Sequence, residues 1–260
     1  MLDYSFSLVD FEYFLLVLVR ISTFIFVAPF FSHTSVPNRV KISLAFVVSI
    51  MVSSVLAPTE ATSYESMFGY SIFVIREAAV GLLIGYAASL CNYIILFAGN
   101  VIDMDIGLSM AQEFDPSLHT QVTMTGQLYY YGIGLLLITS GMYQYLLRAV
   151  IDSFTLIPLG GAIFNWDALL YSMVKFMTNL IIIAFRICLP VFGCIMIMNC
   201  ILGVMAKVAP QMNMFSVGIQ IKILVGFAII LITIFLFGNV GDFIFRQMQE
   251  MMVSFIEGMM

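Results

Sequence analysis

One apolar block constrains the fold of this chain more than any other feature. Between Leu169 and Val208, three of forty residues carry a charge: Lys175, Arg186 and Lys207. As a single helix this block would be about 60 Å long at 1.5 Å per residue, twice the roughly 30 Å hydrocarbon core of a bilayer. Pro190 lies inside the block and predicts a kink, because proline removes a helical hydrogen bond. We therefore expect a long membrane helix that either breaks or extends beyond the bilayer.

Five more apolar blocks lead to the same fold class. They cover residues 11–31, 40–57, 69–102, 128–154 and 214–245. The whole chain is 62% hydrophobic and 10% charged, whereas soluble domains carry about 25% charged residues. We predict an all-α integral membrane protein with about six long, partly broken hydrophobic helices, arranged as helical hairpins, with a non-helical central loop. The length suggests that residues 1–260 form a single domain.

The charge and the scarce chemical groups exclude several classes of protein. A net charge of −5 argues against binding to nucleic acid, which requires a basic stripe. The four cysteines lie in apolar runs and the two histidines are far apart, so neither a metal site nor a cofactor is expected. No catalytic motif is readable, and we do not expect an enzyme. The opening MLDYSFSLVDFEYF lacks a basic region and a small-residue cleavage site, which argues against a cleavable signal peptide.

Five of the charged residues in the apolar blocks are expected to lie within the membrane. They are Arg20, Arg76, Glu77, Arg186 and Lys222. A charge at the centre of a bilayer costs about 2.5–3.5 kcal/mol on insertion scales, so such side chains usually face a protein interior or a water-filled cavity. We expect them to be buried. Internal ion pairs and snorkelling are one interpretation, and the wall of a polar conduit or a subunit contact is the other.

A stripe of small residues predicts close helix packing. Ala78, Gly81, Gly85 and Ala88 follow one another at i, i+3, i+7 and i+10, a spacing that lets two helix backbones approach within a membrane. An intramolecular helix contact and a subunit interface are both consistent with this pattern.

The central segment, residues 100–127, is more acidic than the apolar blocks on either side of it. It carries the acids Asp103, Asp105, Glu113 and Asp115 and no lysine or arginine. Pro116 disfavours helix at the residue before it. We therefore predict a non-helical loop here. Its acidity conflicts with the positive-inside rule, which gives this chain no consistent orientation.

The C-terminal segment, residues 242–260, predicts an amphipathic helix. Met248, Met252, Phe255 and Met259 recur at helical spacing on one face. Few basic residues are present to attract anionic lipid. We therefore expect this face to dock on a partner rather than on the membrane surface.

Four strings together resemble one protein family, the FliR/SctT family of type III export-gate proteins. They are LVRISTFIFVAPFFSHTSVPNRVKISLA, EFDPSLH, AVIDSFTLIPLG and LGVMAKVAPQMNMFSVGIQIKILVG, in the family's order. PFFSHTSVPNR and DSFTLIPLG look more like the flagellar branch than the virulence branch. One departure is Gly141-Met142-Tyr143, where many members place Gly-His-His, so no role of those histidines carries over.

The resemblance implies a subunit of a protein-conducting gate. It would lie in the bacterial inner membrane at the flagellar basal body, in one complex with FliP-like and FliQ-like subunits and beside an FlhB-like subunit. The gate would pass unfolded export substrates and contact membrane lipid. The family's central loop closes the pore as a plug. The matching plug positions here are Gly107, Ser109, Met110, Ala111, Glu113, Asp115, Pro116 and His119.

Three other functions remain open at this point. A virulence type III export gate is the nearest. A secondary transporter or ion channel could use Arg20, Arg186 and the Asp103–Asp105 pair as a substrate or proton path. A scaffold for assembly would differ from a gate only if changes in the central segment left export normal.

Overall fold

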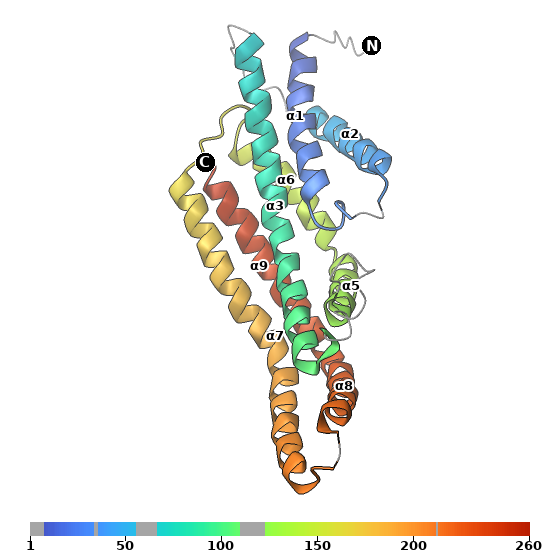
Figure 1. Ribbon diagram of the computed structural model, residues 1–260. Coiled ribbons are helices and arrows are strands. Elements are labelled where there is room, and N and C mark those ends of the chain that lie inside the picture. Colours follow the sequence, from blue (N-terminus) through green and yellow to red (C-terminus); the bar gives the residue numbers. More distant parts are fainter. Residues whose placement is uncertain (1–7, 34–35, 56–66, 110–122, 212) are drawn as a thin grey trace. The chain divides into compact units, whose positions relative to one another are not determined.

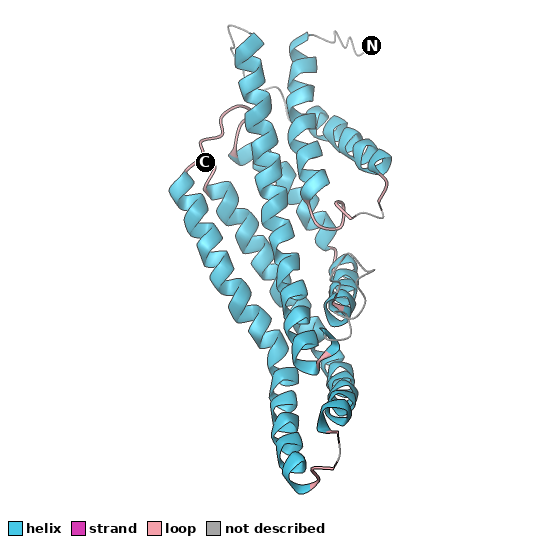
Figure 2. Ribbon diagram, viewed as in Figure 1, coloured by secondary structure: helices cyan, strands magenta, loops and turns pink. Residues whose placement is uncertain are grey.

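The structure is a computed structural model that describes residues 8–33, 36–55, 67–109, 123–211 and 213–260. Within these ranges the regular structure is helical and no strand occurs (Figure 2). Among the described residues, four helices are long and apolar enough to cross a membrane, and a fifth span results if the bent pair of α5 and α6 is counted as one. The prediction of an all-α membrane protein is therefore confirmed.

The helices follow in chain order and carry the labels of Figure 1. They are α1 (Leu8–Val27), α2 (Asn38–Val55), α3 (Met67–Ile106), α5 (Met124–Thr139), α6 (Met142–Leu156), α7 (Trp166–Val208), α8 (Met214–Thr233), the 3₁₀ turn η1 (Ile234–Leu236) and α9 (Phe237–Glu257).

The six expected blocks correspond to these helices with two subdivisions. The fourth block is divided between α5 and α6 at Gly141, whose φ of 78° is a conformation that glycine adopts without steric cost. The sixth block is interrupted by η1, between α8 and α9. α3 and α7 stay continuous over 40 and 43 residues, and Pro190 lies within α7 without ending it.

The chain divides into two compact units. Unit 1 contains residues 1–90, 141–176 and 246–260, and unit 2 contains residues 91–140 and 177–245. α3, α7 and α9 each contribute to both units. The core of each unit is described separately below.

In unit 1, α1 packs against α2 and against the first part of α3 (Figure 1). The rings of Phe14 and Phe46 meet edge to face at 5.7 Å between α1 and α2. On α3, a Cβ added to Gly81 would collide with the Arg20 carbonyl oxygen, and one added to Gly85 would lie 3.0 Å from the Phe24 carbonyl oxygen. The small-residue stripe is thus occupied by α1 of the same chain.

The stripe is not buried along its whole length. Gly81, Gly85 and Ala88 are buried and Ala78 is half-buried.

The end of α9 also packs into unit 1. Met248, Met252, Phe255 and Met259, the apolar face expected for a partner, are all buried within this chain. Ser254 and Ser172 share a 2.6 Å hydrogen bond between α9 and α7. The backbone N–H groups of Ile163 and Asn165 donate to the carbonyl oxygens of Met259 and Gly258, at 3.1 and 3.0 Å. The C-terminus therefore lies beside the start of α7 (Figure 1), and its apolar face contacts this chain instead of a partner.

Unit 2 is formed by the end of α3, α5, the rest of α7, α8 and the start of α9. Close glycine contacts recur there: a Cβ on Gly226 of α8 would lie 2.5 Å from Ile106 Cδ1 of α3. Cys188 of α7 donates from Sγ to the Ala98 carbonyl oxygen of α3 at 3.2 Å. These contacts hold α7 and α8 against the end of α3.

Much apolar surface stays exposed on this chain. On α7, Phe185, Leu189, Phe192, Ile197 and Ile201 are each at least 40% exposed. Such surface is too extensive for a soluble monomer and is typical of a helix covered by lipid or by other membrane subunits.

Candidate functional site

A buried ion pair links α1 and α3 in unit 1. Arg20 Nε donates to Glu77 Oε2 at 2.6 Å and Arg20 Nη2 donates to Glu77 Oε1 at 3.1 Å. Both side chains have no exposed surface. The two parallel hydrogen bonds form the bidentate geometry that the planar guanidinium favours.

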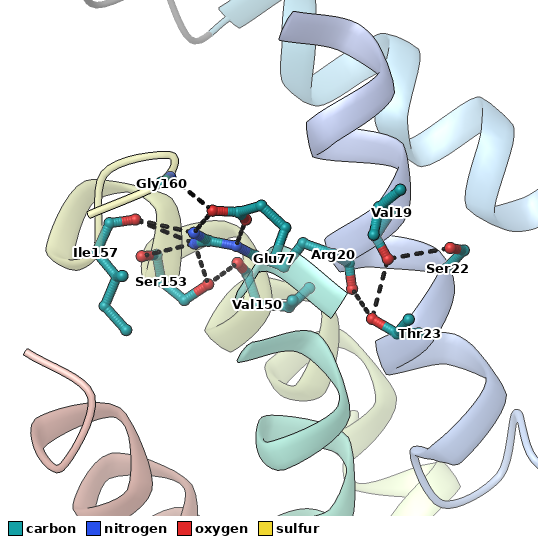
Figure 3. Close-up of polar contacts among 9 residues, drawn as sticks. All are labelled: Val19, Arg20, Ser22, Thr23, Glu77, Val150, Ser153, Ile157 and Gly160. Carbon is teal, nitrogen blue, oxygen red and sulfur yellow. Dashed lines mark hydrogen bonds and ion pairs between the residues drawn. The ribbon is translucent and has the colours of Figure 1, made fainter. Parts of the chain in front are cut away.

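The rest of the Arg20 guanidinium is directed at the end of α6 (Figure 3). Nη1 donates to the Ser153 carbonyl oxygen at 3.2 Å and to Ser153 Oγ at 3.3 Å. Both terminal nitrogens donate to the Ile157 carbonyl oxygen at 3.1 Å. The Phe154 ring lies 4.3 Å from Arg20 Cζ, a cation–π distance. The Ile157 carbonyl belongs to the C-cap residue of α6, a position whose carbonyl has no intrahelical partner, and the arginine satisfies it. The Ser153 carbonyl also accepts from the Ile157 N–H, at 2.8 Å.

Neighbouring residues of α3 hold the turn that follows α6. The Gly160 N–H donates to Glu77 Oε1 at 2.9 Å, and Arg76 Nη1 donates to the Gly160 carbonyl oxygen at 3.1 Å. Gly160 has a φ of 75°, and a Cβ there would lie 2.5 Å from the Phe73 ring. This position therefore requires glycine for its backbone conformation and for its contact with Phe73.

Together these contacts form one buried polar cluster, which we call the Arg20–Glu77 cluster: Arg20, Glu77, Ser153, Ile157 and Gly160. It joins α1, α3, the end of α6 and the α6–α7 connection. Every charged atom in it has a hydrogen-bond partner, as a buried charge requires. The cluster contains no nucleophile with an adjacent base. Its chemistry fits fixing the positions of helices and does not fit a reaction.

A second polar contact lies in unit 2, between the end of α3 and the start of α5. Asp103 is fully buried. Its Oδ2 accepts from the Thr125 N–H at 3.1 Å, and its Oδ1 accepts from the Thr125 hydroxyl. The carboxylate thus lies against the N-terminus of α5, where the helix dipole favours negative charge.

Asp105 lies on the same end of α3 and has a different environment. Its Oδ2 is buried without a hydrogen-bond partner among the described residues. Lys222 of α8, which is half-buried, is the cation whose charge acts on it. The pair has no direct hydrogen bond, so its interaction is electrostatic only.

The predicted plug positions are partly described. Gly107 follows α3 with a φ of 92°, and its N–H donates to the Asp103 carbonyl oxygen at 3.1 Å. Ser109 Oγ donates to the same oxygen at 3.4 Å. Six of the predicted positions lie outside the described residues: Met110, Ala111, Glu113, Asp115, Pro116 and His119.

The predicted central loop, residues 100–127, is partly helical. Helix occupies both ends of residues 100–127, since α3 continues to Ile106 and α5 begins at Met124. Asp103 and Asp105 are therefore helical residues and not loop residues. Residues 110–122 lie outside the described residues.

The five predicted intramembrane charges are not alike. Arg20 and Glu77 are fully buried and form a pair, and Lys222 is half-buried. Arg76 and Arg186 are exposed on this chain, so their burial stays a prediction that depends on partner subunits. The sequence of an apolar run does not show which face of the helix carries a charged residue. A helix that packs against its own chain on one face leaves the opposite face exposed.

Three contacts of the site could not be predicted from the sequence. The partner of Asp103, Thr125, lies 22 positions away. The partners of Arg20, namely Glu77, Ser153 and Ile157, lie 57, 133 and 137 positions away in the sequence. The third is the pair of Gly99 and Gly126, which touch backbone to backbone. The two glycines are visible in the sequence, but their pairing depends on how α3 and α5 meet.

No group of His, Cys, Asp or Glu residues suited to a metal ion is found in the part of the chain that the structure describes.

The chain is similar to bacterial export proteins over most of its length. The profile of the bacterial export proteins, family 1, matches residues 11–248. The flagellar biosynthetic protein FliR of Bacillus subtilis (strain 168) is 31% identical over 229 residues, which cover 87% of this chain and 88% of that protein. FliR of Escherichia coli (strain K12) is 25% identical over 239 residues, 92% of this chain and 90% of that protein. The surface presentation of antigens protein SpaR of Shigella flexneri is 25% identical over 217 residues, 83% and 82% of the two chains.

Proposed function

The chain belongs to family 1 of the bacterial export proteins, and we propose that, as a subunit of the flagellar protein export gate, it helps to form and close the channel that passes unfolded flagellar subunits. The observation that carries this proposal is the family match over residues 11–248, together with 31% identity to a protein named flagellar biosynthetic protein FliR. The chain is a membrane protein and a member of a multi-subunit export complex.

The exposed apolar surface supports a place among other membrane subunits. α3 and α7 have 40 and 43 residues, about 60 Å or more each at 1.5 Å per residue, whereas the hydrocarbon core is roughly 30 Å thick. Lipid cannot cover such helices from end to end. In our proposal FliP-like and FliQ-like subunits cover the remainder, an FlhB-like subunit lies beside them, and the complex occupies the inner membrane at the flagellar basal body.

The central segment is our candidate for the part that closes the channel. In the sequence it lies between Gly107, which follows α3, and the start of α5, where Asp103 binds Thr125. Its acids, small residues and methionines suit a seal that lies in an aqueous channel and yields to a passing polypeptide. The closing residues in this proposal lie between Gly107 and Thr125.

The test replaces residues 110–122 with a short glycine–serine linker, which leaves Gly107, Asp103 and Thr125 in place. The variant is produced with the complete set of partner subunits, and assembly is checked by co-purification. Ion conductance is then measured across vesicles that contain the complex. We expect a leak that the unaltered complex does not show.

A matched control tests whether shortening alone disturbs the assembly. The same kind of linker replaces residues 57–65, which lie between α2 and α3. We expect an intact complex without a leak. If the 110–122 variant assembles normally and its conductance equals that of the unaltered complex, the closing role of this segment is wrong.

A further inference from the structure

The N-terminus of α5 is capped from another helix. A helix leaves its first four N–H groups without intrahelical partners, and the residue at the N-cap position usually satisfies one of them with its side chain. Thr123 occupies that position and is a good capping residue by type, but its side chain makes no cap hydrogen bond. The Asp103 carboxylate, which belongs to α3, accepts from the Thr125 N–H and the Thr125 hydroxyl instead.

The backbones of α3 and α5 are in direct contact at this point. The Gly126 Cα lies where a Cβ on Gly99 would be. A Cβ on Gly126 would in turn meet Thr123 Oγ1. Gly99 cannot carry a side chain unless the helices separate, and a side chain on Gly126 would displace Thr123 Oγ1. The close approach at these glycines brings the N-terminus of α5 within reach of a carboxylate on α3.

The same aspartate also takes part in ending α3. Its carbonyl oxygen accepts from the Gly107 N–H at 3.1 Å and from Ser109 Oγ at 3.4 Å. Asp103 therefore satisfies the end of one helix with its main chain and the start of the next with its side chain. Because the residue is fully buried, water does not replace these hydrogen bonds at low cost.

We propose that Asp103 is a positioning residue that fixes the start of α5 to the end of α3, forming a joint with Thr125, Gly99 and Gly126 that stays closed while the channel opens. The contribution of this joint to gating rests on the proposed function, whereas the joint itself does not. The opposite arrangement, a free hinge at Thr123, would require local capping of α5, and Thr123 does not provide it.

The first experiment compares three variants by hydrogen exchange in the assembled complex, following peptides that cover residues 123–130. Hydrogen bonds to a charged group contribute about 1.5–3 kcal/mol, which corresponds to roughly tenfold or more in the opening equilibrium. We expect Asp103→Ala to speed exchange at the start of α5 at least about tenfold. Asp103→Asn keeps one acceptor oxygen and is expected to have an intermediate effect.

Thr123→Ala is the matched control. At an ordinary N-cap, loss of threonine loosens the first turn about fivefold. Here we expect exchange within about twofold of the unaltered protein. If Thr123→Ala loosens the first turn of α5 as much as Asp103→Ala does, the helix is capped locally and the proposal is overturned.

The second experiment measures ion conductance of the same complexes. We expect Asp103→Ala to leak, Asp103→Asn to leak less, and Thr123→Ala to remain tight. A tight Asp103→Ala complex, in a preparation where the 110–122 replacement leaks, would overturn the positioning role. If the 110–122 replacement does not leak, the proposed closing role of this segment fails, and the exchange series alone decides whether Asp103 holds α5.

Discussion

Arg20 Nε lies 2.6 Å from Glu77 Oε2, and neither side chain has any exposed surface. The two residues come from α1 and α3 and are 57 positions apart. Removing both charges from water costs several kcal/mol for each ion, and their attraction offsets this only when the geometry is good and the remaining polar atoms have partners. Ser153, Ile157 and Gly160 supply those partners. The pair is therefore better understood as a device that fixes the arrangement of three helices than as a source of stability.

Removing one member of this pair should be more harmful than removing both. Arg20→Met leaves the Glu77 carboxylate buried without its cation, and we expect a loss of about 3–5 kcal/mol in the free energy of unfolding. The double variant Arg20→Met/Glu77→Met removes both charges and is expected to recover part of that loss. Unfolding in detergent can be followed by the fluorescence of Trp166, the single tryptophan, at the start of α7. Equal instability of the single and double variants would contradict this explanation of the pair.

Gly160 should not tolerate a side chain. Gly160→Ala would place a Cβ 2.5 Å from the Phe73 ring at a φ of 75°. Overpacking costs about 1–3 kcal/mol, and a left-handed backbone adds to it for a residue other than glycine. Gly161→Ala is the control, because Gly161 is exposed and has no positive φ. We expect it to change stability by about 0.5 kcal/mol. The measurement is the midpoint of chemical unfolding of each variant. Similar midpoints for both variants would exclude a special role for Gly160.

The glycine contact between α1 and α3 can be tested in the same way. Gly81→Ala would place a Cβ against the Arg20 carbonyl oxygen and Thr23 Oγ1, so α1 must move away, and we expect a loss of about 1–3 kcal/mol. Gly193→Ala in α7 meets nothing within 4 Å and should stabilise the helix by roughly 0.5–1 kcal/mol. Thermal unfolding of the purified complex should shift in opposite directions for the two variants. A shift in the same direction would show that the α1 contact does not limit this position.

Lys222 and Asp105 should behave as a coupled pair. Lys222→Met removes the cation that acts on Asp105, whose Oδ2 is buried and has no hydrogen bond in the described part of the chain. We expect a loss of up to about 1 kcal/mol in the free energy of unfolding, the range of ion pairs that solvent partly screens. Adding Asp105→Asn should restore part of it. A double-mutant cycle on unfolding free energies measures the coupling, and strict additivity would mean that the two charges do not interact.

The sequence predicts the helical class well because apolar block length and periodicity are local properties. Residues 69–102 and 169–208 were recognisable as helix without any knowledge of their partners, and α3 and α7 correspond to them. The division of residues 128–154 at Gly141 was missed, since a single glycine within an apolar run is tolerated in many helices. Its φ of 78° depends on the path of the chain on both sides.

The site is predicted less completely because its contacts are remote in sequence. Arg20 and Glu77 stand out as charges in apolar blocks, but nothing local pairs one with the other or directs Arg20 to Ser153 and Ile157. The same reasoning does not say what covers Arg186, which is exposed on this chain. It also found the apolar face of the C-terminal helix but assigned the wrong occupant, because an amphipathic pattern does not reveal which surface covers it.

The length of α7 has a consequence for how the cell makes this protein. A 43-residue helix is about 64 Å long, so a newly inserted chain has apolar surface that extends beyond the hydrocarbon core of the bilayer. Until its neighbours arrive, that surface favours aggregation and attracts membrane proteases. The amount of this chain in the cell should then follow the supply of its partners and not the strength of its own gene's expression, which makes turnover of the orphan subunit the step that sets the number of finished complexes.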